Sequence, residues 1–405
     1  MASTLPLNGD GSITINSATP ADGLVKLANP ASGAGKNLTI QGSDATSGNN
    51  NGGNIILTPG AKSGTGSDGK VGVGITTPGA KLEIAGDMRI SDGSGNKSII
   101  VALPPTGNPT YDGPNIQAAI NALPANGGTV ILPRGTYVVN QNASTGYAIA
   151  LNDGVHLVGS SMYGTQIQVA SGTTNIIVIS VLNPSTSYAT IVIKDLLVDG
   201  YSQTGITGIN IKSNPNYPAY GPQPALIQNV RVRNCPATGI KVESWFSEIH
   251  NCYIQNCTTG IDLTYPNPYA TNATTILHTY VWGVTTGIQI NGIGNQVIGC
   301  NIGGIVAYGI NVVSGLGNYI AGNYIESGAQ YATGVFIQTQ GNTIFGNYFD
   351  LLNSGYEVMI LSSNIESGNM IWGNYSGHST INAPINNQLF SNVGIGTLNL
   401  QQISK

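Results

Sequence analysis

The sequence predicts an all-β protein whose larger part is a stack of parallel β-coils. Glycine makes up 56 of the 405 residues, about twice its usual share, and charged residues make up only 8%. Helices of a soluble protein need charged side chains on their solvated faces, and 18 acidic and 14 basic residues cannot cover many helices. Two short signatures also recur at steps of 21 to 31 residues, which is the range of solenoid repeats.

Charge and hydropathy exclude several function classes. The formal net charge is −4 and no cluster of basic residues occurs, so we expect no nucleic-acid binding and no attraction to anionic membranes. The sequence has no stretch of about 18 apolar residues, which argues against membrane insertion. The first residues lack the basic and apolar regions of a secretory signal, so we expect synthesis in a cytoplasm and release by another route.

The four cysteines do not have the paired spacing of a zinc site, and a disulfide framework would be unusual in a chain with a sizeable core. We therefore expect four free, buried thiols, and no metal or other cofactor: Cys235, Cys252, Cys257 and Cys300.

The N-terminal quarter of the chain is polar and rich in turn residues. Residues 1–36 predict an N-terminal arm, and residues 37–104 predict short strands at 38–41, 54–57, 71–75, 82–84, 88–90 and 98–101, with turn sequences between them. Strands this short bury too little surface to be stable within one chain. We expect copies of the chain to stabilise residues 37–104 around a threefold axis, as a trimeric β-rich stalk.

Residues 70–90, KVGVGITTPGAKLEIAGDMRI, resemble a segment of bacteriophage tail fibres and related trimeric fibres. In that family a Val-Gly-Val/Ile-Gly turn precedes a Pro-x-Ala-Lys-Leu strand. A short echo of the turn, NVGIGT, occurs at residues 392–397.

Residues 111–139 predict a helix followed by a strand. Pro114 suits a helix start, an apolar stripe follows at helical spacing, and Pro124 ends the helix before a Gly-Gly turn and a strand at 129–132. The stripe consists of Ile116, Ala119, Ile120 and Leu123. This segment resembles the start of the pectin-lyase-like (pectate-lyase-like) superfamily of right-handed, single-stranded parallel β-helices, in which a short helix caps the first coil.

The repeats define the extent of the β-helix. A Thr/Tyr-Gly-Ile/Val signature recurs at Gly208, Gly239, Gly260, Gly287, Gly309 and Gly334, and an Asn-x-Val/Ile-x-Gly signature begins at Asn295, Asn318, Asn342 and Asn369. Repeats of this length fit coils of two or three short strands. We expect the β-helix at residues 105–380 and a strand-like tail at 381–405.

Two carboxylates share one position in neighbouring repeats. Glu326 lies eight residues after Asn318, and Asp350 lies eight residues after Asn342. Equal positions in adjacent coils are ~4.8 Å apart, close to the ~5–5.5 Å between the carboxyl groups of retaining glycosidases. The pair therefore predicts the catalytic residues of a glycoside hydrolase. The alternative is that both side chains point outward at a strand end and are solvated.

Aromatic residues suggest where a glycan could bind. The chain has 19 tyrosines and only 5 phenylalanines, and tyrosine offers a sugar both an apolar ring and a hydroxyl group. Glu243 and Trp245 form one candidate patch, although Trp245 could equally fill a corner of a coil. Four tyrosines in the two longest loops form another, with turn filling as the alternative: Tyr217, Tyr220, Tyr265 and Tyr269. Lys241 and Asp262 follow equivalent glycines, so we expect an ion pair between coils.

Together, the two resemblances imply a bacteriophage tailspike or tail fibre. Members of that family are homotrimers of the virion: their N-terminal parts attach to the phage tail, at baseplate or portal-proximal proteins, and their β-helices meet host cell-surface polysaccharide outside the host cell. Some cleave this glycan and others only bind it, so the resemblance does not decide whether the chain is an enzyme. A non-catalytic structural or decoration fibre, and a free polysaccharide lyase or hydrolase of the same fold, remain the alternatives.

Overall fold

The computed structural model describes residues 40, 55–59, 61, 65, 67–85, 88–91, 98–181, 190–212, 224–264, 271–351, 356–360, 368–376, 380–384, 387–390, 392 and 397–401. These residues form many short strands and one α-helix, which confirms the all-β prediction. The chain divides into two compact units, Met1–Ala85 and Gly86–Lys405.

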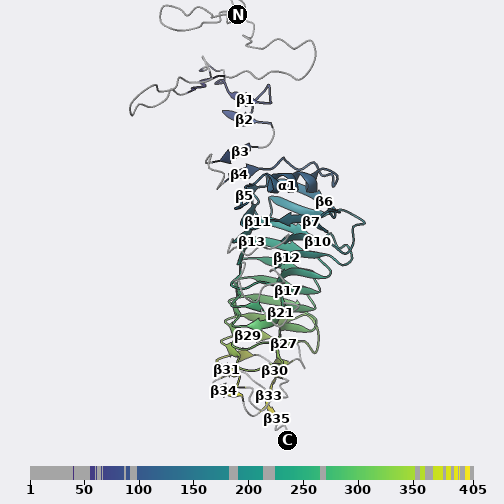
Figure 1. Cartoon of the computed structure of the whole chain (residues 1–405). Helices are drawn as coiled ribbons and strands as arrows, with labels where there is room; N and C mark the ends of the chain where they lie inside the picture. Colours follow the sequence, from purple (N-terminus) through teal and green to yellow (C-terminus); the bar gives the residue numbers. More distant parts are fainter. Residues whose placement is uncertain are drawn as a thin grey trace, which may run out of the picture. The chain divides into compact units, whose positions relative to one another are not determined.

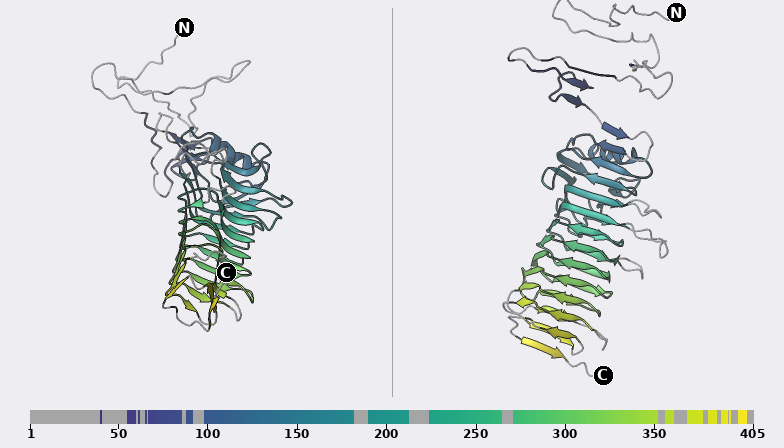
Figure 2. Two further views of the ribbon diagram at one scale, coloured as in Figure 1. Left: turned by 60° about the horizontal axis from the view of Figure 1, so that its bottom comes forward. Right: turned by 90° about the vertical axis from the view of Figure 1, so that its left-hand side faces the viewer.

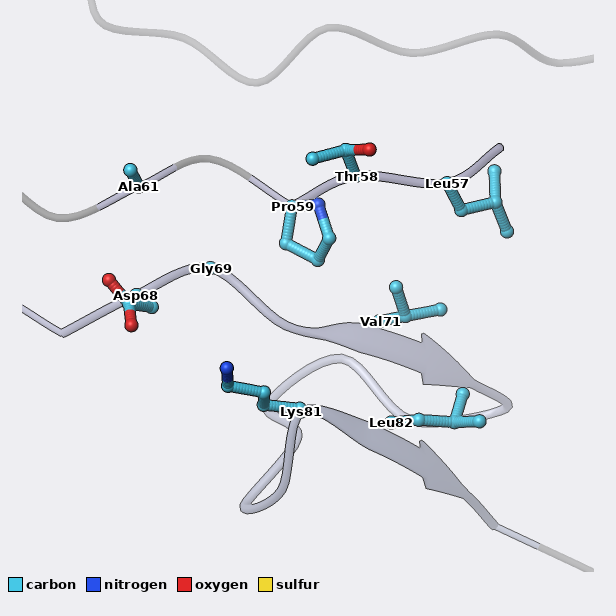
Figure 3. Close-up of a pocket in the computed structure, with 9 residues that line it drawn as sticks. All are labelled: Leu57, Thr58, Pro59, Ala61, Asp68, Gly69, Val71, Lys81 and Leu82. Atoms are coloured by element: carbon cyan, nitrogen blue, oxygen red, sulfur yellow. The ribbon is translucent and has the colours of Figure 1, made fainter. Parts of the chain in front are cut away.

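The first unit contains a small parallel sheet. Strands β1 (Val71–Val73) and β2 (Leu82–Ile84) lie where strands were expected, and Val71 pairs with Leu82. Residues 55–57 are not in a strand, and most of the expected strand at 38–41 lies outside the described residues. The two strands and residues that precede them in the sequence line a cavity of about 560 Å³, with apolar side chains that include Leu57, Val71 and Leu82 (Figure 3).

The second unit is a parallel β-helix with three columns of strands, stacked coil upon coil (Figures 1 and 2). The first column is β4 (Ser98–Val101), β5 (Gly128–Ile131), β8 (Val155–Val158), β11 (Ile191–Asp199), β13 (Ala225–Arg233), β15 (Glu248–His250), β19 (Thr275–Leu277), β22 (Gln296–Ile298), β25 (Tyr319–Ala321), β28 (Thr343–Phe345), β31 (Met370–Trp372) and β34 (Gln388–Phe390). The second is β6 (Gly135–Val139), β9 (Thr165–Val169), the later halves of β11 and β13, β16 (Tyr253–Gln255), β20 (Tyr280–Trp282), β23 (Asn301–Ile305), β26 (Tyr324–Ser327), β29 (Tyr348–Asp350) and β32 (Tyr375–Ser376).

The third column forms a sheet of its own. It runs through β7 (Tyr147–Leu151), β10 (Ile177–Val181), β12 (Thr207–Ile211), β14 (Thr238–Val242), β17 (Thr259–Thr264), β21 (Thr286–Ile293), β24 (Tyr308–Ser314), β27 (Thr333–Ile337), β30 (Tyr356–Ile360), β33 (Thr380–Pro384) and β35 (Thr397–Gln401), and β18 (Thr271–Asn272) pairs with β21. Strand β3 (Met88–Ser91) pairs antiparallel with β4.

The ends of the β-helix differ from the expected boundaries. Helix α1 (Asp112–Asn121) is present where a helix was predicted and packs against β6 and β7. Strands β3 and β4 belong to the second unit, although residues up to 104 were expected in the stalk. At the other end, β33, β34 and β35 continue the columns beyond residue 380, where the tail was expected to begin.

The glycine signature lies in the third column, where there is no space for a side chain. A β-carbon on Gly260 would lie 2.5 Å from Cγ1 of Val281 and 2.6 Å from the carbonyl oxygen of Gly287 in the next coil. Neighbouring coils can approach this closely only where both residues are glycine. The threonines that precede these glycines are aligned in the same way, and Thr259 pairs with Thr286 of the next coil.

The asparagine signature spans the strands of the first column from β22 to β31, with its asparagine at the turn before each strand and its glycine at the turn after it. Its glycines, which include Gly322 and Gly346, have φ angles of +63° and +61°, a conformation that L side chains rarely adopt. Its asparagines and Asn387 form a buried ladder, in which the side-chain oxygen of each residue after Asn295 accepts hydrogen bonds from the asparagine one coil earlier: Asn295, Asn318, Asn342, Asn369 and Asn387. A second ladder follows the signature glycines: Asn323, Asn347, Asn374 and Asn392.

The interior between the columns is apolar, with buried isoleucines and valines in successive coils. The four cysteines lie in this interior as free thiols, as expected. Burial raises the pKa of the Cys300 thiol to about 11, so the thiol is protonated at neutral pH. In the described part of the chain, no helix is long and apolar enough to span a membrane.

Candidate functional site

The outward side of the second column carries two parallel rows of side chains, which we call the tyrosine face. Alternate residues of a strand point to opposite sides, so Ile254, Val281 and Ile325 point into the core while their neighbours point outward. The first row, in order of paired Cα atoms, is Arg231, Tyr253, Tyr280, Asn301, Tyr324, Tyr348 and Tyr375. The second row is Arg233, Gln255, Trp282, Gly303, Glu326 and Asp350.

The rings of the first row stack along the axis of the column. The ring centroids of Tyr253 and Tyr280 are 4.6 Å apart, those of Tyr324 and Tyr348 are 5.4 Å apart, and those of Tyr348 and Tyr375 are 5.1 Å apart. Tyr348 and Tyr375 are 41% and 46% exposed. The stack therefore forms a ledge of aromatic rings and hydroxyl groups that is open to solvent, interrupted at Asn301.

Glu326 and Asp350 lie side by side on this face. They are paired Cα partners on β26 and β29, so the predicted stacking of the two residues is confirmed. Their catalytic role stays a prediction. Glu326 is half-buried and Asp350 is exposed, which leaves both carboxylates open to a ligand.

Tyr324 holds one of these carboxylates in place. Its hydroxyl group donates a hydrogen bond of 3.0 Å to Oδ2 of Asp350. Loss of solvent around the hydroxyl, together with the hydrogen bond and charge of Asp350 and the charge of Glu326, raises the pKa of Tyr324 to about 12. The hydroxyl group therefore keeps its proton at neutral pH and remains a donor.

A tryptophan lies beside the carboxylates because glycine leaves room for it. A β-carbon on Gly303 would lie 2.3 Å from Cζ3 of Trp282 and 3.5 Å from Oε2 of Glu326, so the indole crosses the position that a side chain would occupy. The pairing of β23 with β26 shifts register just after this point, and Gly304 has a φ of +59°. The result is an aromatic ring next to a carboxylate, an arrangement suited to a sugar ring with hydroxyl groups.

The other predicted binding residues lie elsewhere. Glu243 follows β14 in the third column and is only 9% exposed. Its Oε1 forms an ion pair with Nζ of Lys241, at a distance of 2.6 Å. Trp245 is half-buried in the same segment. The four loop tyrosines lie outside the described residues: Tyr217, Tyr220, Tyr265 and Tyr269. Their roles stay predictions.

The prediction of an ion pair between Lys241 and Asp262 is wrong, because Lys241 pairs with a different carboxylate. The two residues are paired Cα partners, as the repeats predicted, but the lysine reaches the carboxylate of Glu243 on its own segment. Asp262 instead accepts hydrogen bonds from the side chains of Thr264 and Gln289. Burial raises the pKa of Asp262.

Sequence reasoning missed the tyrosines of the face, although a signal was present. Tyr324, Tyr348 and Tyr375 each lie six residues after a signature asparagine. The same count that paired the carboxylates therefore pairs these rings. Among the described residues, no three histidine, cysteine or acidic side chains are grouped as metal ligands.

Comparisons with known proteins identify the fold. No protein-family model and no curated protein matches the chain. Among solved structures, the A-module of the Azotobacter vinelandii mannuronan C-5 epimerase AlgE4 is similar, with a TM-score of 0.53, 18% identity, and coverage of 75% of this chain and 96% of the module. At this identity the likeness shows the fold alone, a parallel β-helix.

Bacteriophage tailspikes are also among the similar structures. A tailspike of Escherichia coli bacteriophage HK620, solved with a pentasaccharide, has a TM-score of 0.48, 15% identity, and coverage of 74% of this chain and 63% of the tailspike. Tailspike protein 2 of the E. coli O157:H7 bacteriophage CAB120 has a TM-score of 0.47, 14% identity, and coverage of 69% and 44%.

Proposed function

We propose that the chain is a bacteriophage tailspike or tail fibre that adsorbs to a host cell-surface polysaccharide through the tyrosine face. The observation that carries this proposal is the register of stacked, outward tyrosines beside Trp282 and two carboxylates. Aromatic rings pack against the apolar faces of sugars, and the hydroxyl groups and carboxylates can bond to sugar hydroxyls. A polymer laid along the column would meet the same groups once per coil.

The carboxylate pair supports hydrolysis of the bound glycan. Adjacent strands lie ~4.8 Å apart, which favours the short carboxyl separation of retaining glycosidases over the ~6.5–9.5 Å of inverting ones. Because Tyr324 fixes an oxygen of Asp350, we assign Asp350 as the nucleophile that attacks the anomeric carbon. Glu326 then protonates the leaving oxygen, and afterwards takes a proton from the water that hydrolyses the glycosyl–enzyme bond.

The first unit supports assembly as a homotrimer. Its two-stranded sheet is too small to be stable alone, and it leaves Ile56, Val73 and Leu82 more than half exposed. Copies of the chain that cover these side chains would supply the missing core. In this proposal residues 1–36 attach the trimer to a baseplate or portal-proximal protein of the phage tail, so the protein resides on the virion and acts outside the host cell.

The proposal is tested with the purified full chain and a panel of bacterial lipopolysaccharides and capsular polysaccharides. We expect binding to at least one of them, release of reducing ends, and a light-scattering mass three times that of the 41.7 kDa chain. Glu326→Gln and Asp350→Asn are expected to retain binding and lower the hydrolysis rate by about 10²–10⁴-fold. Glu248→Gln, which changes an outward carboxylate of the first column, serves as the matched control.

Each part of the proposal can fail separately. A wild-type chain that binds no polysaccharide of the panel would contradict adsorption. Binding without hydrolysis would leave a non-catalytic fibre, and equal hydrolysis by all three variants would show that the catalytic pair lies elsewhere. A monomeric mass would contradict the trimer and favour a free polysaccharide-binding protein or enzyme of this fold.

A further inference from the structure

Arg231, the first residue of the tyrosine face, is held between two aromatic rings. The guanidinium carbon lies 5.0 Å from the ring centroid of Tyr253 and 5.5 Å from that of Tyr163. Its Nη2 donates a hydrogen bond of 3.0 Å to Oε1 of Gln255 on the second row. These contacts fix a planar cation at the edge of the face.

This cation lacks the partner that its neighbour has. Arg233 forms an ion pair of 2.8 Å with Oδ2 of Asp199, whereas no ion pair among the described residues includes Arg231. The Nε of Arg231 is buried without a hydrogen-bond acceptor. A buried donor without an acceptor is rare in folded proteins, so the guanidinium group of Arg231 has hydrogen-bonding capacity that the described chain does not use.

The register fixes the distance between this cation and the carboxylate pair. Arg231 on β13 is followed in the same row by Tyr253, Tyr280, Asn301 and Tyr324, and Tyr324 lies two residues before Glu326. Four strand spacings separate the two positions, which is about 19 Å along the column. One extended oligosaccharide can therefore contact both.

We propose that Arg231 forms a subsite for an oxyanion substituent of the glycan, a carboxylate or a phosphate group on the sugar bound about 19 Å along the column from Glu326. This inference rests on the proposed function and names its substrate class: acidic polysaccharides. The guanidinium group is suited to it, because its donors match the geometry of carboxylate and phosphate oxygens. The net charge of −4 gives the chain no general attraction for anionic polymers, so the preference depends on this local cation.

The test uses the full chain and an acidic polysaccharide of the panel that it binds, compared with two derivatives of the same polymer. One derivative has its carboxyl groups reduced to alcohols, and the other has its phosphate groups removed. We expect the derivative that lacks the recognised group to bind about 10- to 100-fold more weakly to the wild type. The derivative that loses affinity identifies the oxyanion.

Two variants and a control assign this preference to Arg231. Arg231→Gln is expected to bind the acidic polymer and the neutral derivative equally, and Arg231→Lys to retain the charge but only part of the preference. Arg134→Gln removes the same charge from an exposed turn and is expected to keep the full preference. The lysine variant preserves the cation between the rings, so it remains informative if the glutamine variant folds poorly.

The outcomes separate this inference from the function on which it rests. A wild type that binds no polysaccharide overturns both proposals. A wild type that binds acidic and neutralised polymers equally, or an Arg231→Gln variant that keeps the preference, overturns only the oxyanion subsite and leaves adsorption in place.

Discussion

The asparagine ladders and the tyrosine face follow the same coils but face opposite environments. Asn318, Asn342 and Asn369 are buried at the corner of the coils, whereas Tyr324, Tyr348 and Tyr375, six residues later, point into solvent or lie at its boundary. Both are continuous because equal positions in successive coils are paired. The β-helix therefore repeats two kinds of residue in one register: one stabilises the fold, and the other offers a surface to a ligand.

The physical difference is whether a polar group has access to water. A buried asparagine must find every hydrogen-bond partner within the protein, and each ladder residue finds them in the coils before and after it. An outward tyrosine can bond to water instead, so its identity is not constrained by folding. We therefore expect substitutions in the ladders to change stability, and substitutions in the tyrosine face to change binding.

The largest effect is expected from Asn347→Ala in the second ladder. The side chain of Asn347 donates to the carbonyl oxygen of Ile320 and to Asn374, and it accepts from the backbone and side chain of Asn323. Alanine leaves these buried groups without partners, so we expect the free energy of unfolding to fall by about 3 kcal/mol. Urea unfolding followed by circular dichroism measures this loss.

The control for this prediction is an exposed amide two coils earlier in the β-helix. Gln296→Ala removes an outward side chain of β22 and is expected to leave the unfolding midpoint unchanged. If both variants unfold at the same urea concentration, the ladder does not stabilise the fold. The proposed difference between the buried ladders and the solvent-facing side chains would then be wrong.

A smaller effect is expected from Tyr348→Ala on the tyrosine face. The ring of Tyr348 stacks between those of Tyr324 and Tyr375, in the centre of the exposed ledge. Its removal is expected to weaken glycan binding about 3- to 10-fold, and Tyr348→Phe should bind nearly as well as the wild type because the ring remains. Calorimetric titration with the bound polysaccharide measures the difference.

The matched control is an outward tyrosine of the first column. Tyr319→Ala alters β25, one column away from the tyrosine face, and is expected to leave the affinity unchanged. An equal loss of affinity in both variants would mean that the glycan does not select the tyrosine face.

Much of the fold could be predicted because it depends only on counting along the chain. The signature glycines fall in one column and the signature asparagines at one corner, and the pairing of Glu326 with Asp350 followed from the same count. The last coil escaped this reasoning because it is short: Asn369 and its ladder partner Asn387 are only 18 residues apart. The strands beyond residue 380 therefore resembled a separate tail.

The details of the candidate site could not be predicted, because they depend on side-chain choices and local irregularities. Paired Cα positions placed Lys241 beside Asp262, but a flexible lysine can choose between two carboxylates, and it pairs with Glu243. The shift of register after Gly303 has no counterpart in the repeated signatures of the sequence. Nothing in the sequence therefore indicated that Trp282 would lie beside Glu326.

The smallest effect is expected at Asp262, which points outward from the third column. Its side chain is partly buried, so its exposure to water is intermediate between that of the asparagine ladders and that of the tyrosine face. Burial raises the pKa of this carboxyl group in the folded state above its ordinary value of 3.8. The folded protein therefore binds the proton more tightly than the unfolded chain, and stability is lost as the pH rises from that value through the folded-state pKa.

The Asp262→Asn variant cannot ionise at this position, and its side-chain oxygen can still accept the hydrogen bonds of Thr264 and Gln289. We expect the variant to melt at the same temperature as the wild type in acid and slightly above it at neutral pH. Thermal melts across this pH range measure the difference, and a difference that does not vary with pH would mean that packing, rather than the buried charge, distinguishes the two proteins.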